Sequence, residues 1–394
     1  MTRRMASRLG LIGTSPTIAL KMEADKLERE GRRVVDFGPG EPDLPTPEPA
    51  KRAAIAAIEE NFTHYTAAAG IHELRVEIAR HYGALSGASI APEEVLTGVG
   101  GKSVLFAAML SLVNPGDDVC LVAPYWVSFP EQVRLAGGNI VLAKTVPEDG
   151  FTIRAEAIEA ALTPATSMVI VNSPCNPSGG VLPRAEAEAL ARLAVQHDLW
   201  LVSDETYEAL VYDPADRVSM LMFRDILGER LLFVSAFSKT WAMTGWRIGY
   251  GIGAKSVIKA MLTIQSHDTT HPASISQRAG LAALREAADA PQHMLTVYRG
   301  RRDRIVAGLN RIPGITCPVP RGAFYAYADV RELAAMKGLP SSFELSRQLL
   351  AIEAVATVPG EAFGMGGYLR FSYATSDEEI DEGLARLDRF ARAR

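Results

Sequence analysis

Four side chains that could carry chemistry follow three successive apolar runs in the middle of the chain. Asn176 lies in a proline-flanked turn after the first run. Asp204 and Tyr207 follow the second run, and Lys239 follows the third. Together they offer a carboxamide, a carboxylate, a phenol and an amine. A lysine acts as a nucleophile or base only in its uncharged form, which a cationic, partly desolvated pocket favours.

Each of these residues also has an ordinary structural explanation. Asp204 could cap the next helix, and a lysine such as Lys239 is most often solvated at the surface. The Gly100–Gly101 pair before a helix is usually just a turn, although N–H groups at a helix N-terminus also bind anions. Structure alone explains poorly why all these groups follow consecutive apolar runs.

Short apolar runs alternate with helical patterns from about residue 95, which predicts strands and helices in turn. Continuous apolar strands separated by amphipathic helices are typical of a mainly parallel sheet buried on both faces. Open α/β sheets bind ligands outside the carboxyl ends of their strands, so we expect the four side chains to meet at one edge. The predicted strands are Glu94–Gly98, Asp118–Ala123, Ile140–Lys144, Ser167–Asn172, Leu199–Ser203 and Leu231–Ala236, and the helices between them include Lys102–Val113 and Arg184–His197.

The pattern changes after about residue 290. A charged helix over Pro291–Arg311 and an alternating strand over Tyr368–Tyr373 predict a smaller α+β region. The first forty residues lie outside the alternating block, and we expect them to pack with this region. We therefore predict an α/β protein with a large domain over residues 46–290 and a small α+β domain over residues 1–45 plus 291–394.

Composition excludes several classes of function. The chain has 394 residues, 48% hydrophobic and 22% charged, with a formal net charge of −5, which is typical of a globular protein without a nucleic-acid partner. The sequence holds no apolar run long enough to span a membrane. Its three cysteines are far apart and form no CxxC pair, which argues against a disulfide scaffold or a metal site and fits a reducing compartment. We predict a cytoplasmic protein.

Several motifs, in order, resemble those of the fold-type I, class I aminotransferases, and specifically the bacterial aspartate-aminotransferase-like subgroup. The resemblance runs from about Ser15 to the C-terminus and implies the PLP-transferase fold type I. The motifs are Gly40-Glu-Pro-Asp43, Tyr65-Thr-Ala-Ala-Ala-Gly-Ile71, Gly100-Gly-Lys102, Pro124-Tyr-Trp-Val127, Asn172-Ser-Pro-Cys-Asn-Pro177, Ser203-Asp-Glu-Thr-Tyr207, Ser238-Lys239 with Gly245-Trp-Arg247-Ile-Gly-Tyr250, and Leu369-Arg370-Phe-Ser-Tyr373.

The resemblance implies the cofactor pyridoxal 5′-phosphate (PLP) and a role for each residue around it. Lys239 would hold PLP as a Schiff base and then move the proton during catalysis. Asp204 would pair with the pyridinium nitrogen, which makes the ring an electron sink. Tyr207 and Asn176 would hydrogen-bond the phenolic oxygen of the cofactor, and Trp126 would stack on the ring. Asn176 and Trp126 would also border the substrate.

The phosphate group needs anion donors. The resemblance implies backbone N–H groups of Gly101 and Lys102 at a helix N-terminus, together with Ser238 and the guanidinium of Arg247. It also implies a homodimer, in which Tyr65 of one copy reaches the phosphate bound by the other.

Two positions depart from the pattern of the family. Ala236 stands where many relatives have a serine three residues before the lysine, so one phosphate hydrogen bond could be lost or supplied by Ser238. His271 precedes Pro272, where a small residue is more usual. If His271 faces the pocket, it could alter which side chain is accepted; otherwise it is a structural residue.

The substrate is predicted from two cationic residues. Arg370 would clamp the α-carboxylate beside the backbone of Gly40, since a guanidinium matches a carboxylate in shape. Lys102 stands at a helix N-terminus, where a cation needs a nearby anion. In relatives the matching lysine is linked to dicarboxylate recognition, with help from a serine or threonine such as Ser15 or Thr17. This predicts aspartate or glutamate as donor and 2-oxoglutarate or oxaloacetate as acceptor, in a ping-pong reaction.

Alternatives remain at this point. The substrate could instead be prephenate, or an aromatic or other neutral amino acid such as methionine or kynurenine. A PLP lyase acting on Cβ or Cγ could use the same residues. A non-enzymatic ligand sensor is disfavoured, because all the catalytic positions are occupied.

Overall fold

In the computed structural model, which describes residues 5–13 and 16–393, the largest element is a seven-stranded sheet of order β2-β8-β7-β6-β5-β3-β4. All its strands run parallel except β8, which is antiparallel to β2 and β7. The prediction of an α/β fold with a mainly parallel sheet is therefore confirmed. The strands are β2 Val95–Gly98, β3 Asp118–Ala123, β4 Asn139–Lys144, β5 Thr166–Asn172, β6 Trp200–Asp204, β7 Leu231–Ala236 and β8 Gly249–Gly253.

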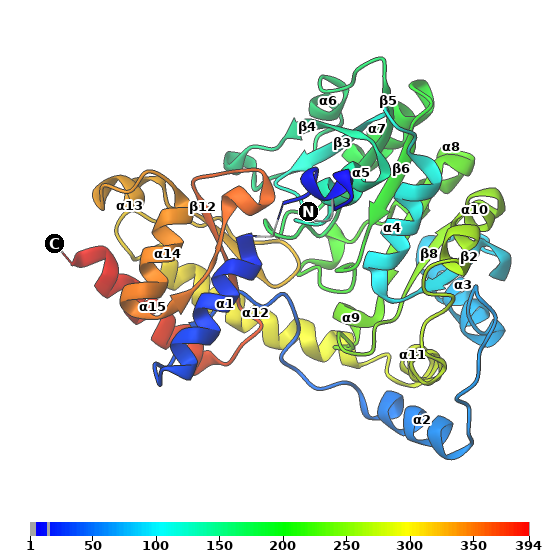
Figure 1. The fold of residues 1–394 in the computed structure, drawn as a ribbon, viewed down its shortest axis with the longest axis horizontal. Helices are drawn as coiled ribbons and strands as arrows, with labels where there is room; N and C mark the ends of the chain where they lie inside the picture. Colours follow the sequence, from blue (N-terminus) through cyan, green and yellow to red (C-terminus); the bar gives the residue numbers. More distant parts are fainter. Residues whose placement is uncertain (1–4, 14–15, 394) are drawn as a thin grey trace.

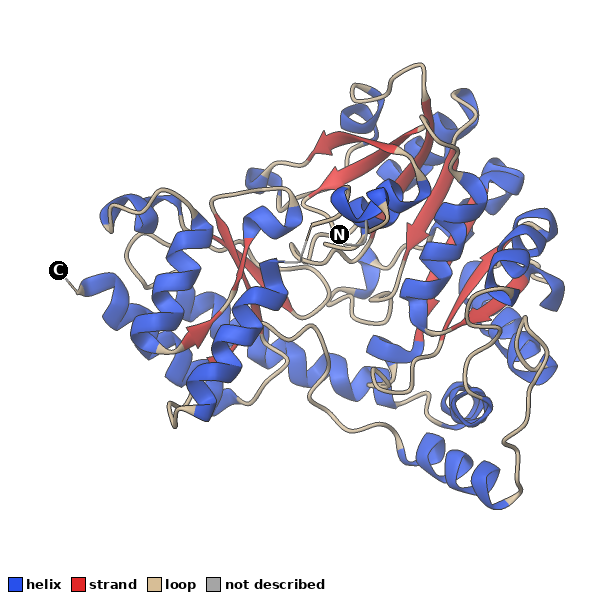
Figure 2. Ribbon diagram, viewed as in Figure 1, coloured by secondary structure: helices blue, strands red, loops and turns tan. Residues whose placement is uncertain are grey.

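Helices cover both faces of this sheet (Figure 2). Successive strand residues point to opposite faces, so alternate residues join different cores. In β3, Cys120 and Val122 belong to one core, while Val119 and Leu121 belong to the other. Burial on both faces explains why the strands are continuous apolar runs. The first core is closed by α2 Glu48–Glu59, α3 His72–Ser86, α6 Ala155–Glu159, α7 Arg184–Gln196, α8 Arg224–Leu227 and α11 Ser274–Glu286, and the second by α4 Gly100–Leu112, α5 Phe129–Ala136 and α10 Lys255–Ser266.

A second region is built around a three-stranded antiparallel sheet of order β11-β12-β9 (Figure 1). The N-terminal part of the chain joins it, because β1 pairs with β10 and α1 packs against α14. The exact limits of the two domains stay a prediction. The elements are α1 Pro16–Arg29, β1 Val35–Asp36, α12 Ala290–Leu309, β9 Tyr325–Asp329, α13 Arg331–Met336, α14 Ser342–Glu353, β10 Val355–Ala356, β11 Val358–Pro359, β12 Tyr368–Ser372 and α15 Asp377–Arg392.

Strand β8 was not predicted, because three of its five residues are glycine, which weakens strands in general. Its place in the sheet explains the glycines. A Cβ on Gly249 would lie 2.3 Å from the backbone nitrogen of Gly101, and one on Gly251 would lie 3.0 Å from Val104. The glycines therefore let β8 lie directly against the first turn of α4. Tertiary contact outweighs local strand propensity here.

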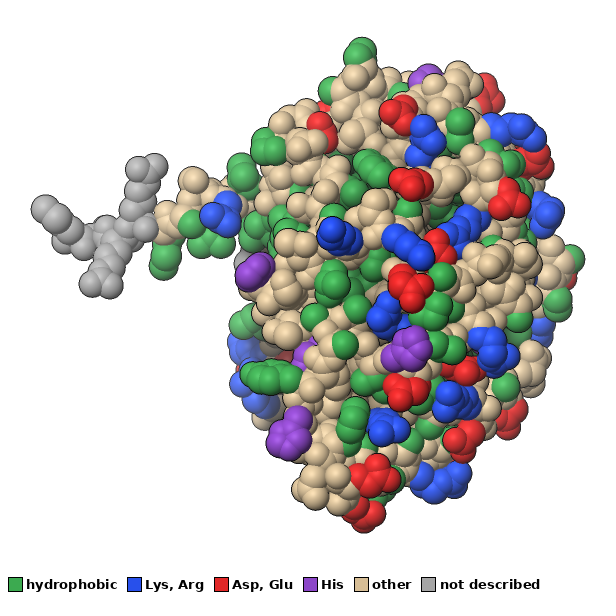
Figure 3. Space-filling model, turned by 90° about the vertical axis from the view of Figure 1, so that its right-hand side faces the viewer, with side chains coloured by type: hydrophobic (Ala, Val, Ile, Leu, Met, Phe, Trp, Pro, Cys, Tyr) green, Lys and Arg blue, Asp and Glu red, His purple; other side chains and the backbone are tan. Residues whose placement is uncertain are grey.

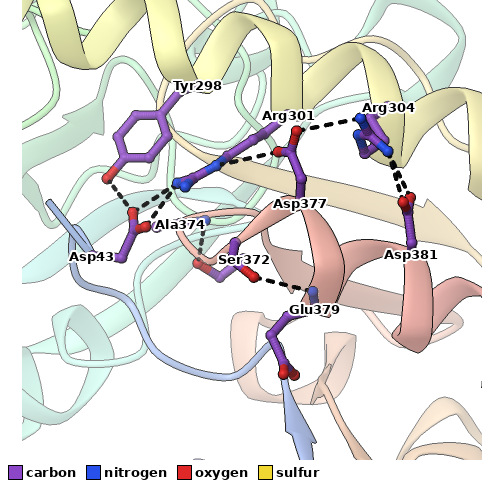
Figure 4. A network of polar contacts seen from close by, with 10 residues as sticks. Asp43, Tyr298, Arg301, Arg304, Ser372, Ala374, Asp377, Glu379 and Asp381 are labelled. Carbon is purple, nitrogen blue, oxygen red and sulfur yellow. Dashed lines mark hydrogen bonds and ion pairs between the residues drawn. The ribbon is translucent and has the colours of Figure 1, made fainter.

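The long helix α12 anchors the segment between β1 and α2 (Figure 4). Nη1 of Arg301 donates to both carboxylate oxygens of Asp43, each at 2.9 Å, and the Tyr298 hydroxyl donates to the same carboxylate at 3.2 Å. The Arg301 side chain is only 12% exposed, so solvent screens this pair less than an ordinary surface pair. Arg304, which pairs with Asp377 and Asp381, is much more open.

We predict that Arg301→Met lowers the free energy of unfolding by roughly 2 kcal/mol, because Asp43 loses its cationic partner in a half-buried place. Arg304→Met is the matched control on the same helix and should change little, because exposed ion pairs contribute little. Urea denaturation of both variants tests this. Equal losses from the two substitutions would contradict a special role for the pair with Asp43.

Candidate active site

A cavity of about 460 Å³ lies at the carboxyl ends of β5, β6 and β7, where β9 and β12 of the second region approach the large sheet. The predicted sheet edge is therefore where the chain forms this cavity. Most of the residues predicted for the site line it, and Tyr65 does not. Those that line it are Gly40, Gly101, Lys102, Trp126, Asn176, Asp204, Tyr207, Ser238, Lys239, Arg247 and Arg370.

Lys239 projects into the cavity from the short helix α9 Phe237–Thr240, which follows β7 directly. Its Nζ donates a hydrogen bond to the backbone carbonyl of Gly40. Burial lowers the pKa of Lys239 to about 8; the carboxylate of Glu41 opposes this, and the cations of Arg370 and Arg247 add to it. The uncharged amine is therefore accessible near neutral pH, as a nucleophile or base requires.

Asp204 is the last residue of β6 and is buried. Its Oδ1 accepts hydrogen bonds from the backbone N–H of Thr206 at 3.1 Å and from the Thr206 hydroxyl at 2.6 Å. Burial nevertheless raises the pKa of Asp204 to about 6, against the lowering by Thr206 and by Lys239. A cation placed beside this carboxylate would stabilise its charged form.

Arg370 lies on β12 and is only 6% exposed. Its Nη1 donates to Oδ1 of Asn176 at 2.8 Å, and its Nη2 donates to the carbonyl of Gly38 at 2.6 Å. Its Nε is buried without a hydrogen-bond partner. Burial lowers the pKa of Arg370, and the nearby Tyr325, Tyr207 and Asp36 oppose this. A buried guanidinium is costly unless opposite charge compensates it, so the site favours an anionic ligand here.

Two further cations lie at the N-terminus of α4: Lys102 on the helix itself, and Arg247, which comes from the segment before β8. Gly100 has a positive φ of 77°, and a Cβ there would lie 2.6 Å from Nη2 of Arg247, so only glycine lets the arginine come so close. Nζ of Lys102 lies 5.0 Å from the centre of the Trp126 ring, within range of a cation–π interaction. Burial, and then Arg247, lowers the pKa of Lys102. This end of the cavity is an anion site.

These groups fit the three reactive parts of PLP. Arg247 and the backbone N–H groups at the start of α4 suit a phosphate, the buried carboxylate of Asp204 suits a protonated pyridine, and the amine of Lys239 suits a carbonyl carbon. Ser238 and Ala236 also line the cavity, so the position of the missing serine faces the predicted cofactor. Among the described residues no group of His, Cys, Asp or Glu could hold a metal ion.

Residues that support the site and were not identified from the sequence include Asn172 and Thr206, which line the cavity, and Tyr325, which contacts two residues that do. The Tyr325 hydroxyl lies 2.8 Å from the Tyr207 hydroxyl, and the Arg370 guanidinium lies 4.5 Å from the centre of the Tyr325 ring. Asn172 joins two neighbouring strands, because its Nδ2 donates to the Asp204 carbonyl at 3.0 Å and its Oδ1 accepts from the Asn176 N–H at 2.8 Å. Thr206 orients Asp204. Asn172 lies within a recognised motif, so it could have been found; the sequence around Tyr325 carries no comparable signal.

The remaining predicted residues lie elsewhere. Tyr65 is 90% exposed and does not line the cavity of its own chain. His271 does not line it either; its Nε2 accepts a hydrogen bond from the Thr66 N–H at 3.2 Å, which favours the structural interpretation. Ser15 lies outside the described residues, and so does the side chain of Thr17.

Comparisons with known proteins agree with this geometry. The family model described as aminotransferase class I and II matches residues 32–387. The aspartate/prephenate aminotransferase of Thermus thermophilus is 43% identical over 390 residues, 98% of each chain. The aspartate aminotransferase of Streptomyces avermitilis is 41% identical over 392 residues, 98% of this chain and 96% of that one. The structure of the Thermus thermophilus aspartate aminotransferase with maleate matches with a TM-score of 0.92 and 41% identity, over 99% of this chain and 100% of that chain.

We predict that Asp204→Asn stabilises the cofactor-free protein in a pH-dependent way. Because the pKa of Asp204 rises from 3.8 to about 6 on folding, the folded chain binds the proton more tightly, and stability falls as the pH rises through that window. Ionisation of Asp204 in the folded chain therefore lowers the free energy of unfolding by roughly 3 kcal/mol at pH 7.5 and by about half of that at pH 5. The variant removes this cost and keeps the shape of the side chain.

Denaturant unfolding of the cofactor-free protein at pH 5 and pH 7.5 measures the difference. Asp216→Asn is the control, since Asp216 forms an ion pair with Arg321 and its loss should destabilise the fold. A gain from Asp204→Asn that is equal at both pH values would show that the buried charge is not its cause.

Proposed function

The chain belongs to the class I and II aminotransferases, PLP-dependent enzymes that move an amino group between an amino acid and a 2-oxo acid, and we propose that aspartate or glutamate is its donor. The acceptor would be 2-oxoglutarate or oxaloacetate. The observation that carries this proposal is that the cavity holds two basic side chains, Arg370 and Lys102, in addition to Lys239 and the arginine suited to a phosphate.

Arg370 is proposed to bind the α-carboxylate. It is already held on two sides, by Asn176 and by the carbonyl of Gly38, so its orientation is set before the substrate binds. Such preorganisation lowers the entropic cost of binding. Its buried Nε has no hydrogen-bond partner and is left to bind an anionic ligand. Every amino acid and 2-oxo acid has this carboxylate, so Arg370 would serve both half-reactions.

Lys102 is proposed to bind the side-chain carboxylate. It lies over the Trp126 ring in the first turn of α4, where the helix dipole disfavours a cation. A second carboxylate on the substrate would compensate both the dipole and the charge of Arg247. The relative from Thermus thermophilus that was solved with maleate binds a small dicarboxylate, which supports this assignment.

When bound, PLP would form a Schiff base with an amine and withdraw electrons from Cα, so that the amino group can be exchanged in two half-reactions. Lys239 would first hold the cofactor and then accept and return the proton at Cα, for which its lowered pKa is suitable. Asp204 would keep the ring nitrogen protonated. Tyr207 and Asn176 would hydrogen-bond the phenolic oxygen, and Trp126 would pack on the ring.

We also propose a cytoplasmic homodimer. A tyrosine that is 90% exposed and does not line its own cavity is useful for catalysis only if it reaches another copy. In that arrangement Tyr65 of each copy would donate to the phosphate in the other. The three cysteines are all free and buried, which fits a reducing compartment, and no helix among the described residues could cross a membrane. The large domain would span residues 46–290, and the small domain residues 1–45 plus 291–394.

Prephenate is a second candidate substrate, because the Thermus thermophilus relative is an aspartate/prephenate aminotransferase. Prephenate also carries two carboxylates, so the same pair of cations could hold it. The test is to let aspartate donate its amino group and then to add prephenate in place of 2-oxoglutarate or oxaloacetate. Return of the original absorption band would show that prephenate accepts the amino group.

We predict that the visible absorption band of the PLP-loaded protein shifts when aspartate or glutamate is added without any oxo acid. Addition of 2-oxoglutarate should then restore the original band, because a transaminase returns the amino group. A response to aromatic or neutral amino acids alone would refute the acidic-substrate assignment. Release of pyruvate and ammonia from a β-substituted amino acid would instead indicate a lyase.

We predict different effects for the two cations. Lys102→Ala should raise the KM for aspartate on the order of ten- to a hundred-fold, as expected for a lost charged hydrogen bond, and should leave the KM for alanine nearly unchanged. Arg370→Gln should impair both amino acids, because both have an α-carboxylate. Steady-state kinetics with aspartate and alanine measure this. An equal effect of Lys102→Ala on the two substrates would place Lys102 at the phosphate instead.

A further inference from the structure

The loop that carries Tyr65 is held far more firmly than its exposure suggests. Residues 60–71 connect α2 with α3 on the side of the molecule seen in Figure 3, where histidine, apolar and charged side chains are interspersed. Three buried polar side chains from residues 265–277 hydrogen-bond to this loop. Ser274 donates to the Phe62 carbonyl at 2.7 Å, Gln265 to the Ala68 carbonyl at 2.7 Å, and Gln277 accepts from the Ile71 N–H at 2.7 Å.

His271 supplies the contact nearest to the tyrosine. Its Nε2 accepts from the Thr66 N–H at 3.2 Å, so the ring proton must be on Nδ1, which donates to the Pro272 carbonyl at 2.7 Å. The His271 ring also packs edge-on against the Tyr65 ring, with centroids 5.7 Å apart and an interplanar angle of 86°. One side chain thus fixes both the backbone next to Tyr65 and the orientation of its ring.

The segment that presents His271 is itself strained. Thr270, a β-branched residue, has a positive φ of 62°, a conformation that costs energy and persists only when the surroundings impose it. Here the Thr270 N–H donates to the Gln265 carbonyl at 2.8 Å, and the Pro272 carbonyl accepts from Nε2 of Gln277 at 2.8 Å. The same two glutamines therefore support the turn and the loop. This strain lowers stability, and it would serve no function if Tyr65 contacted only solvent.

We propose that His271 is a positioning residue for Tyr65: by holding the Thr66 N–H and the edge of the tyrosine ring, it aims the Tyr65 hydroxyl at the cofactor phosphate bound by a second copy of the chain. This inference rests on the proposed role of Tyr65 in the homodimer. It also assigns a use to a histidine that departs from the small residue expected at this place. His271 acts through Tyr65 and needs no contact with cofactor or substrate.

The test compares PLP affinity in a double-mutant cycle of His271→Ala and Tyr65→Phe, measured by equilibrium dialysis of the dimer and absorbance of retained cofactor. Each single substitution should weaken PLP binding, His271→Ala on the order of five-fold, the value of one typical hydrogen bond. In the Tyr65→Phe background, His271→Ala should have almost no further effect, because there is no hydroxyl left to position.

Two more variants separate positioning from general damage to the fold. His271→Gln keeps an acceptor close to the Thr66 N–H and should recover most of the affinity. His197→Ala removes a surface histidine paired with Glu159 and should leave PLP affinity unchanged. Analytical ultracentrifugation checks that each variant keeps the assembly state of the unaltered protein.

The outcomes distinguish this inference from the proposed function. If Tyr65→Phe weakens PLP binding but His271→Ala does not, or if the two effects add fully, His271 does not act through Tyr65 and the inference is wrong. If Tyr65→Phe binds PLP as tightly as the unaltered protein, the role proposed for Tyr65 fails, and positioning by His271 fails with it. Failure of His271→Gln to recover affinity would exclude the hydrogen bond to Thr66 as the cause.

Discussion

Buried charge that the fold itself leaves only partly compensated is the physical constraint on which this structure depends. Asp204 and Arg370 are buried, and Lys239 is partly buried. Burial raises the pKa of Asp204 and lowers those of Lys239 and Arg370, which favours the uncharged form of each. Such groups lower stability unless rigid structure holds them and a ligand of opposite charge compensates them. The cavity is therefore costly to the fold and selective for a molecule that carries both a cation and several anions. PLP together with an acidic amino acid has that pattern.

Rigid support for these charges comes from backbone and side-chain links between the two regions. Asn172 bridges Asp204 to Asn176, Asn176 holds Arg370, and Arg370 in turn holds the Gly38 carbonyl. The links cross from the large sheet to β12 and then to the segment after β1. Further along that segment, Asp43 is bound by Arg301 of α12. The segment that carries the Gly38 and Gly40 carbonyls is therefore held in place by a contact outside the cavity. Geometry at the cavity thus depends on contacts well outside it.

Much of the fold and of the site could be predicted because both arise from repeated local patterns. Doubly buried strands must be apolar, and parallel strands bring the residues beyond their carboxyl ends to one edge, so Asn176, Asp204 and Lys239 were found together. Strand β8 was not predicted, because its glycines have low strand propensity and are explained by close packing against Gly101. Tyr325 was not predicted, because its role depends on a contact with Tyr207 that joins distant parts of the chain. Prediction from the sequence fails where contacts between distant parts of the chain determine the local structure.

Three carboxyl groups are buried at the end of β6 and just after it, and they differ in their relation to the cavity: those of Asp204, Glu205 and Glu208. Burial raises the pKa of Glu205 to about 8, against the hydrogen bonds that its Oε1 accepts from Ser203 and from the Met220 N–H, so Glu205 stays protonated near neutral pH. Burial also raises the pKa of Glu208, whose carboxyl accepts from the Tyr82 hydroxyl at 2.8 Å. Neither glutamate lines the cavity. Burial raises the pKa of Asp204 as well, but only to about 6, and Asp204 is the one of the three that lines the cavity. It is therefore the carboxylate of this segment that can pair with a cationic ring.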